Sequence, residues 1–299
     1  MGIKFRLIVM NFLQYAIWGS WLISLGAYLG GGLDFTGLQI GSFFATMGVA
    51  SLFMPAVMGI IADRWIPAQK LLGICHLVSG GFLIAAASQT AYGPLYSCML
   101  LSVMFYMPTI ALSNSVAYNA LDLARLDTVK HFPPIRVWGT VGFIAAMWFV
   151  DLTHIGGVQI KLTEWQLYVS AVLSFLLAVY SFSLPGCPVD RTVKARSWVD
   201  TLGLRAFTLF KEKRMAIFFV FSMLLGAALQ ITNAFGDSYI QSFGSMPQYA
   251  DSAIVKHSVI LLSLSQMSET FCILLIPFFL RRFGIKKVML ISMLAWVLR

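Results

Sequence analysis

The chain has 299 residues, of which 59% are hydrophobic and only 11% are charged. Soluble domains carry about 25% charged residues, so this composition excludes an ordinary soluble domain and indicates a protein of the lipid bilayer. The formal net charge of +9 raises the question of nucleic acid, but the basic residues lie in short segments between apolar runs. We therefore expect no nucleic-acid partner.

Hydropathy divides the chain into eight complete membrane spans and the beginning of a ninth. Each apolar run is about as long as a helix needs to cross roughly 30 Å of hydrocarbon. Lipid offers no partners for open backbone groups, so we predict an all-α membrane protein. The predicted spans are 7–29, 39–61, 71–88, 94–118, 134–153, 166–184, 215–240, 257–280 and 285–299.

The basic residues orient these spans. With the N-terminus in the cytoplasm, the segments that face inside hold 17 of the 21 Lys and Arg residues. Lys161 and Lys256 fall in outer segments, whereas Arg136 and Arg299 belong to helices. Because short cytoplasmic loops are normally rich in Lys and Arg, the sequence predicts a cytoplasmic N-terminus.

The longest connection follows the sixth span. It runs from Pro185 to Arg214, is basic, and contains a segment at 198–210 able to form an amphipathic surface helix. We expect an N-terminal six-helix bundle at 1–184, a cytoplasmic linker at 185–214 and a partial second bundle at 215–299. One continuous bundle with a long loop is the alternative.

A weak internal repeat favours two bundles. Gly59, Asp63 and Arg64 after the second span, and the loop 282–287 after the eighth, supply complementary parts of one loop signature, six spans apart. Six-span repeats of this kind are typical of the major facilitator architecture. The chain stops within the apolar run 288–299, so we expect a C-terminally truncated chain with about eight or nine of twelve spans.

Charge near the centre of a membrane helix is costly and indicates a functional residue. Of the twelve acidic residues, only Glu269 lies near the middle of a predicted span, and Gln266 lies on the same helical face. We predict that this face looks into the bundle, with Glu269 as the candidate for proton coupling. In the alternative, Glu269 is protonated and only hydrogen-bonds a neighbouring helix.

A second polar pair, Gln230 and Asn233, lies on the seventh predicted span. Amides offer both donors and acceptors, so together with the pair on span eight they suit ribose hydroxyls and the edge of a base. The alternative is that the amides only join helices. Two such pairs on consecutive spans favour a binding site.

The fifth predicted span opens with Pro133 and Pro134, which suit the first turn of a helix. Arg136, Thr140 and Phe143 then share one stripe that combines a cation, a hydroxyl and an aromatic ring able to stack on a base. The alternative for Arg136 is that its side chain extends to the cytoplasmic interface.

Catalytic and phosphate-binding motifs are absent from the sequence. There is no G-x-x-x-x-G-K-[ST], G-x-S-x-G or H-E-x-x-H, and the cysteines and histidines show no metal-ligand spacing. We therefore expect a transporter driven by an ion gradient, with no enzyme activity, metal or cofactor. Further polar and tryptophan residues are interpreted as helix-packing or interface residues: Gln14, His76, Asn114, Asp237, Trp18 and Trp21.

Three stretches carry a resemblance to a known family. They are 12–22 (Phe-Leu-Gln-Tyr-Ala-Ile-Trp-Gly-Ser-Trp-Leu), 132–140 (Phe-Pro-Pro-Ile-Arg-Val-Trp-Gly-Thr) and 221–233, which begins Phe-Ser-Met-Leu-Leu-Gly and ends Leu-Gln-Ile-Thr-Asn. In these stretches and through nearly all its length, the chain resembles the bacterial nucleoside–proton symporters, the nucleoside permeases of the major facilitator superfamily.

The resemblance implies twelve spans in two six-helix bundles and uptake of nucleosides such as uridine and adenosine across the inner membrane. It implies nucleoside, protons and the lipid bilayer as partners, and we expect a monomer. The pocket residues that it implies are Arg136, Thr140, Phe143, Gln230, Asn233, Gln266 and Glu269. Two other functions stay open on the residues alone: transport of another hydroxylated solute such as a sugar, and a receptor that binds without transporting.

Overall fold

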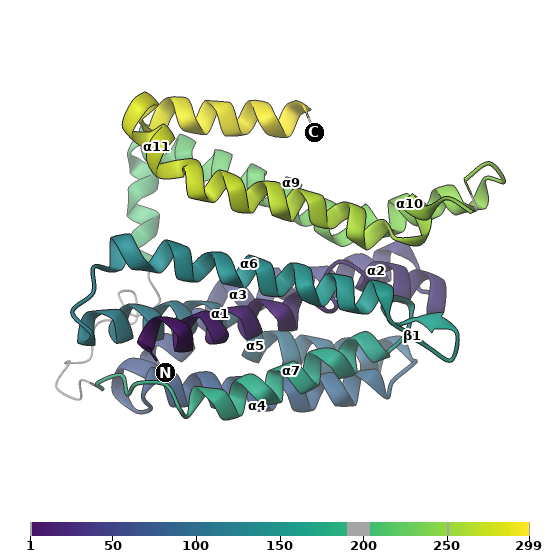
Figure 1. Cartoon of the computed structure of the whole chain (residues 1–299), viewed down its shortest axis with the longest axis horizontal. Helices are drawn as coiled ribbons and strands as arrows, with labels where there is room; N and C mark the ends of the chain where they lie inside the picture. Colours follow the sequence, from purple (N-terminus) through teal and green to yellow (C-terminus); the bar gives the residue numbers. More distant parts are fainter. Residues whose placement is uncertain (1, 190–203, 250, 299) are drawn as a thin grey trace.

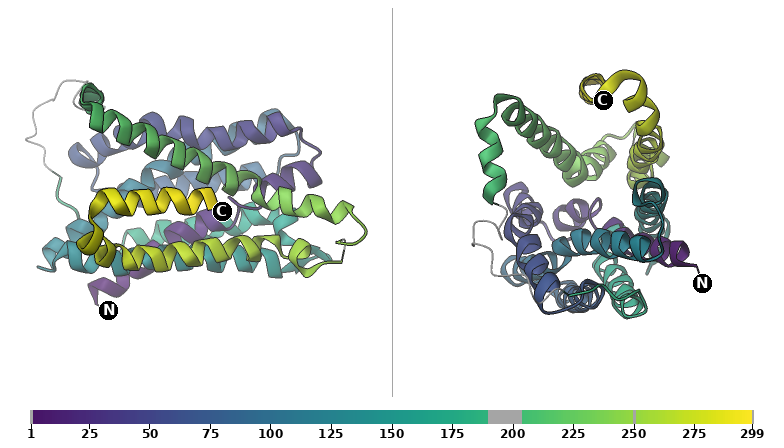
Figure 2. Two further views of the ribbon diagram at one scale, coloured as in Figure 1. Left: turned by 90° about the horizontal axis from the view of Figure 1, so that it is seen from above. Right: turned by 90° about the vertical axis from the view of Figure 1, so that its left-hand side faces the viewer.

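The computed structural model describes residues 2–189, 204–249 and 251–298. Long helices run side by side through the molecule. The helices of residues 2–189 form one close group, and α9 and α11 lie above this group in the view of Figure 1; Figure 2 shows the same arrangement from two other sides. The first group contains α1 (Ile3–Gly19), α2 (Leu25–Ala27), α3 (Gly37–Arg64), α4 (Ala68–Ala87), α5 (Tyr92–Leu123), α6 (Thr128–Leu152) and α7 (Trp165–Ser181). The second contains a 3₁₀ helix η3 (Leu204–Lys211), α9 (Lys213–Ser242), η4 (Phe243–Ser245), α10 (Ala253–Lys256) and α11 (Ser258–Leu298).

Five helices of the described chain are long and apolar enough to cross a membrane, which confirms the prediction of a helical membrane protein. They are Gly37–Arg64, Ala68–Ala87, Tyr92–Leu123, Lys130–Leu152 and Lys213–Ser245. A shorter apolar helix covers Trp165–Ser181. α11 changes direction at Gly284 (φ 73°), between the eighth and ninth predicted spans.

The prediction of one continuous helix over 7–29 is wrong. α1 ends at Gly19, a turn follows, and α2 leads into a π-helical turn, η1 (Tyr28–Gly32). Irregular backbone is tolerated at membrane depth only where protein surrounds it, and residues 20–24 are all buried. Ser24 Oγ donates a hydrogen bond to Gln166 Oε1 at 2.9 Å, which ties the turn to α7.

The start of the fifth span also differs from the prediction. α6 begins at Thr128, so Pro133 and Pro134 lie inside the helix and not in its first turn. The carbonyl of Asp127 accepts the His131 N–H at 2.9 Å, which closes the first turn of this longer helix.

A short hairpin that the sequence did not indicate follows α6. β1 (His154–Ile155) pairs antiparallel with β2 (Val158–Gln159), and Gly156 and Gly157 adopt φ of 61° and 85°, as a tight hairpin turn requires. A 3₁₀ turn, η2 (Ile160–Leu162), then leads to α7. The hairpin and α10 lie at the same end of the molecule (Figure 1).

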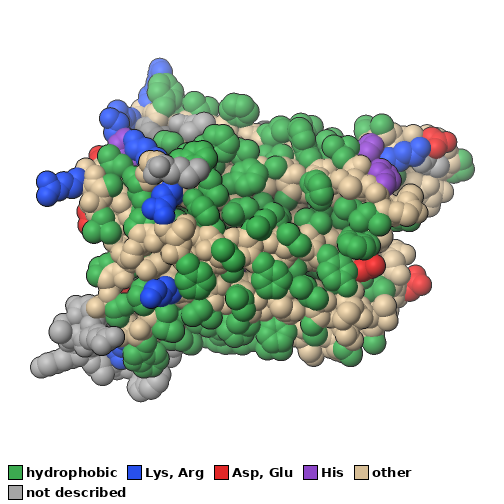
Figure 3. Space-filling view, turned by 60° about the horizontal axis from the view of Figure 1, so that its bottom comes forward, with side chains coloured by type: hydrophobic (Ala, Val, Ile, Leu, Met, Phe, Trp, Pro, Cys, Tyr) green, Lys and Arg blue, Asp and Glu red, His purple; other side chains and the backbone are tan. Residues whose placement is uncertain are grey.

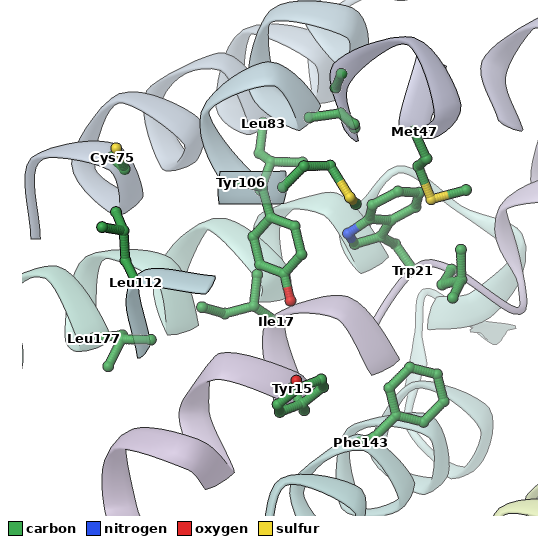
Figure 4. Packing of buried hydrophobic residues seen from close by; sticks show 14 of the residues in the cluster. Tyr15, Ile17, Trp21, Met47, Cys75, Leu83, Tyr106, Leu112, Phe143 and Leu177 are labelled. Carbon is green, nitrogen blue, oxygen red and sulfur yellow. The ribbon is translucent and has the colours of Figure 1, made fainter. Parts of the chain in front are cut away.

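Small residues bring α1 and α6 into close contact. A Cβ placed at Gly142 would lie 2.2 Å from the carbonyl oxygen of Phe12, and one at Gly19 would lie 2.3 Å from that of Phe143. Such small residues are what membrane helices use where their backbones approach closely. The close crossing brings the α6 residues around Phe143 against α1 (Figure 4).

Charge separates along the long axis of the molecule. In Figure 3, Lys and Arg lie mostly toward one end and Asp and Glu mostly toward the other, where His side chains also appear, and hydrophobic side chains cover most of the surface between them. Of the predicted surface helix at 198–210, residues 198–203 lie outside the described chain, and the remainder belongs to η3.

Candidate functional site

A cavity of about 490 Å³ lies between the first helix group and α9. Trp18 of α1, Met107 of α5 and Gln230 of α9 line it, together with a face of α3. Small-molecule sites in proteins usually measure about 300–1,000 Å³ and are mostly apolar with a few polar groups. This cavity has both properties.

In the described part of the chain, two residues that line this cavity each carry a buried hydrogen-bond donor without a partner. The donors are Trp18 Nε1 and the Gln230 amide nitrogen, Nε2. Buried donors are paired in the great majority of proteins, and an unpaired one costs roughly 1–3 kcal/mol. Both donors belong to residues that line the cavity, which makes it a candidate site for a ligand with hydrogen-bond acceptors.

Phe143 lies directly behind Trp18. The two rings meet edge to face with centroids 6.4 Å apart, and Phe143 is 7% exposed. Arg136, two turns earlier on α6, places its guanidinium 3.8 Å from the centre of the Tyr15 ring. A cation over an aromatic face is a favourable arrangement, and it holds Arg136 beside α1. Thr140 is half-buried between them on α6.

The polar pairs on α9 and α11 are only partly gathered at the cavity. Gln230 lines it, whereas Asn233 and Gln266 are half-buried and do not. Glu269 belongs to α11, and its side chain lies outside the described part of the structure. Of the loop residues predicted to act in the conformational change, Gly59 and Asp63 lie in the last turns of α3, and Arg64 ends that helix.

A hydrogen-bonded network supports the α1 face that carries Tyr15 and Trp18. His76 Nε2 lies 2.8 Å from Gln14 Oε1, and Gln14 Nε2 donates to Thr109 Oγ1 at 2.7 Å. The Tyr106 hydroxyl donates to the Gln14 carbonyl at 2.7 Å and points toward α1 in Figure 4. These buried bonds fix α1 against α4 and α5, so the helix-packing interpretation of Gln14 and His76 is confirmed.

Trp18 is one of the cavity residues that the sequence analysis did not assign to the site. It was interpreted, with Trp21, as part of an interface belt, but the Trp18 N–H is buried at the cavity and Trp21 is 4% exposed. A signal was present in the sequence, because Gln14 and Trp18 are four residues apart and so share one helical face.

A second and larger cavity, of about 1,190 Å³, lies at the opposite end of the molecule from the hairpin. The last turns of α5 and the first turns of α6 line it, with Asn114, Asp122 and Thr128 among the polar residues. Asn114 Oδ1 is buried without a hydrogen-bond partner. Asn114 lines this cavity, and the interpretation of Asn114 as a helix-packing or rim residue stays a prediction.

Comparison with known proteins agrees with these features. Residues 1–299 match the family described as nucleoside H+ symporter. The chain is 53% identical to the xanthosine permease and 48% identical to the nucleoside permease NupG, both of Escherichia coli (strain K12), over all 299 residues. It spans 70% of the length of each. A crystal structure of a mutant of the nucleoside transporter NupG is similar, with a TM-score of 0.91 at 47% identity, over 99% of this chain and 73% of that one.

Proposed function

Because the chain belongs to the nucleoside H+ symporter family, we propose that the 490 Å³ cavity receives the nucleoside that it carries. The protein is a transporter and not an enzyme, and its function is proton-coupled import of nucleosides. Membership of this family therefore favours nucleoside transport over the two alternatives, which were transport of a sugar and a receptor that binds without transporting. The two unpaired donors at the cavity carry the proposal for where the nucleoside binds.

A nucleoside matches the groups around this cavity. Its ribose hydroxyls and base carbonyls accept hydrogen bonds, and the proposed donors are the Trp18 N–H and the Gln230 amide, which have no partner in the described part of the chain. The Phe143 ring supports Trp18 edge-on, so base stacking on the tryptophan is favoured over stacking on Phe143. Arg136 and Thr140 of α6, and Asn233 and Gln266, complete the proposed site as α9 and α11 move relative to the first group.

Glu269 is the proposed proton carrier within these 299 residues. It is the acidic residue nearest the middle of the eighth predicted span, and a membrane acid that faces the bundle is a common proton site. Proton uptake by Glu269 would neutralise its charge and so change its interaction with the amides of α9 and α11. This interaction would then differ between the loaded and the returning half of the transport cycle.

The proposed architecture is that of a major facilitator. Residues 1–184 supply six spans, with α1 and α2 together forming the first, 185–214 form a cytoplasmic linker, and 215–299 begin the second bundle. The basic end of the molecule in Figure 3 supports a cytoplasmic N-terminus in a bacterial inner membrane. Transport by a monomer would follow from movement of one bundle against the other, with Gly59, Asp63 and Arg64 at the moving loop.

Uptake of labelled uridine is the test of this function. The transporter is expressed from its full reading frame in a host without its own nucleoside permeases, with and without an uncoupler. We expect accumulation that the uncoupler abolishes and that unlabelled nucleosides, but not sugars, compete away. Accumulation that persists with the uncoupler would contradict proton coupling.

Replacing Glu269 with Gln tests the proton carrier. We expect the Glu269→Gln variant to lose uncoupler-sensitive accumulation while it still exchanges nucleoside down its gradient. Glu212→Gln is the matched control, because Glu212 is exposed at the start of α9 and should leave accumulation unchanged. Wild-type accumulation by Glu269→Gln would remove Glu269 from the coupling mechanism.

A further inference from the structure

Lys161 is buried although it follows the hairpin at the end of the molecule. Its side chain is 1% exposed, which is rare for lysine unless a partner compensates the charge. The partner is Asp151 of α6, whose side chain is fully buried and whose Oδ1 lies 2.6 Å from Lys161 Nζ. An ion pair taken out of water in this way is costly to form, so its position requires an explanation.

The same ammonium group reaches the second helix group. Lys161 Nζ donates to the backbone carbonyl of Lys256 at 2.8 Å, and lies 3.4 Å from Ser258 Oγ. Asp151 also contacts that group, because its Oδ2 lies 2.7 Å from Nδ1 of His257. One buried ion pair therefore holds α10 and the start of α11 against the first group.

A second buried carboxylate continues the contact. Asp237 of α9 is fully buried, accepts a hydrogen bond from Ser258 Oγ, and accepts another from Gln241 Nε2 at 2.9 Å. We call Asp151, Lys161, Asp237 and His257 the outer ion cluster. The sequence analysis had interpreted Asp237 as a packing or rim residue.

Other close contacts beside the cluster also join the two helix groups. A Cβ at Gly26 of α2 would lie 2.8 Å from the carbonyl oxygen of Ala234 on α9. Trp148 of α6 donates to Ser263 Oγ of α11 at 2.8 Å, further along the same interface. The two helix groups therefore touch at the hairpin end both through backbone contact and through hydrogen bonds.

We propose that the outer ion cluster is the outer gate of the transporter, an ionic lock that seals the outer end and must break before a nucleoside can enter from outside. This proposal rests on the proposed orientation, which places the hairpin end outside. The four groups belong to parts that alternating access must separate, α6 and the hairpin segment on one side and α9 to α11 on the other.

Charge balance gives the gate a response to external protons. With His257 neutral, one lysine faces two carboxylates and the cluster carries a net charge of about −1, which a proton on His257 cancels. His257 is 37% exposed, so external water reaches the imidazole beside Asp151. The other charged groups at its segment are Lys256 and Asp251, which are exposed and pair with each other at 3.0 Å. An acidic exterior therefore tightens the gate.

Lys161→Met tests the lock, because it removes the charge and keeps most of the chain length. Spin labels at Val158 of β2 and Ile254 of α10, both exposed, report the separation across the gate in a variant lacking the native cysteines. We expect the ratio of molecules with a long label-to-label distance to those with a short one to rise at least about tenfold. The reason is that removing one partner of a buried ion pair leaves the other charge uncompensated. Lys256→Met is the matched control, because that side chain is exposed and only its backbone carbonyl contacts Lys161.

Three further variants keep the test decisive. Gly26→Ala opposes closure by steric contact alone and should raise the same ratio, while Lys161→Arg should restore it. His257→Gln should remove the dependence of the ratio on external pH. Unchanged distances in both Lys161→Met and Gly26→Ala would overturn the gate, and a wild-type pH response in His257→Gln would overturn the proton effect. Uridine uptake by the wild type is measured in parallel, so that failure of the transport function is seen separately.

Discussion

Replacing Trp18 with Phe should weaken nucleoside binding through the loss of one hydrogen-bond donor. The shorter ring keeps an aromatic face toward Tyr106 and Phe143, whose centroids lie 6.0 and 6.4 Å from that of Trp18. The indole N–H has no partner in the protein, so its loss leaves no protein group unpaired. The effect should therefore appear in the bound state.

The expected size follows from the contribution of a single hydrogen bond. A net contribution of about 0.5–1.5 kcal/mol, with 1.4 kcal/mol for each factor of ten, corresponds to a roughly 2- to 12-fold rise in the KM of uptake. The maximal rate should change little, because the N–H contacts the substrate and not the proton carrier. Initial rates of labelled uridine uptake at several concentrations give both quantities.

Trp165→Phe is the matched control for this prediction. Trp165 is 42% exposed at the start of α7, away from the 490 Å³ cavity, so the same chemical change should leave KM unaltered. An unchanged KM in Trp18→Phe, or an equal rise in Trp165→Phe, would refute the argument that the unpaired donor binds the substrate.

Three further predictions concern stability and reactivity. Gly142→Ala should lower the Tm of the purified protein, because the new methyl group meets the Phe12 backbone and overpacking costs about 1–3 kcal/mol. Gly81→Ala is the control, because a methyl group there lies in open space and should leave the Tm unchanged. His76→Leu should destabilise the protein by roughly 1–3 kcal/mol, since it leaves Gln14 Oε1 without its 2.8 Å partner, and a thermal scan that shows no loss would contradict the network. Burial raises the pKa of the Cys187 thiol. Maleimide labelling of Cys187 should therefore be slow at pH 7 and accelerate as the pH rises toward that pKa. Fast labelling of Cys187 at neutral pH would refute the burial of this thiol.

Composition and hydropathy predicted the helical membrane class because lipid restricts the backbone so strongly. Long apolar runs such as Tyr92–Leu123 have few other solutions, so their helices follow from local sequence. The break after Gly19 could not be predicted in this way, because it depends on Gln166, which reaches Ser24 from a distant helix.

The candidate site was only partly predictable for a similar reason. Gln230 was found because an amide is conspicuous in an apolar run, whereas Trp18 resembles any interface tryptophan until its N–H is seen to lack a partner. Lys161 shows the limit most clearly. A single lysine in an outer loop suggests solvent exposure, and only the fold brings Asp151 and the Lys256 carbonyl to it.

The connection between α6 and α7 has a practical consequence for work on this protein. Loops between membrane helices normally accept epitope tags and insertions, because few of their backbone groups are engaged. Here Gln159 donates to the Asp151 carbonyl, and Gln166 donates to the Lys161 carbonyl at 2.9 Å. A tag placed between the hairpin and α7 would displace these anchors, so reporters intended to be silent belong elsewhere on this face of the membrane.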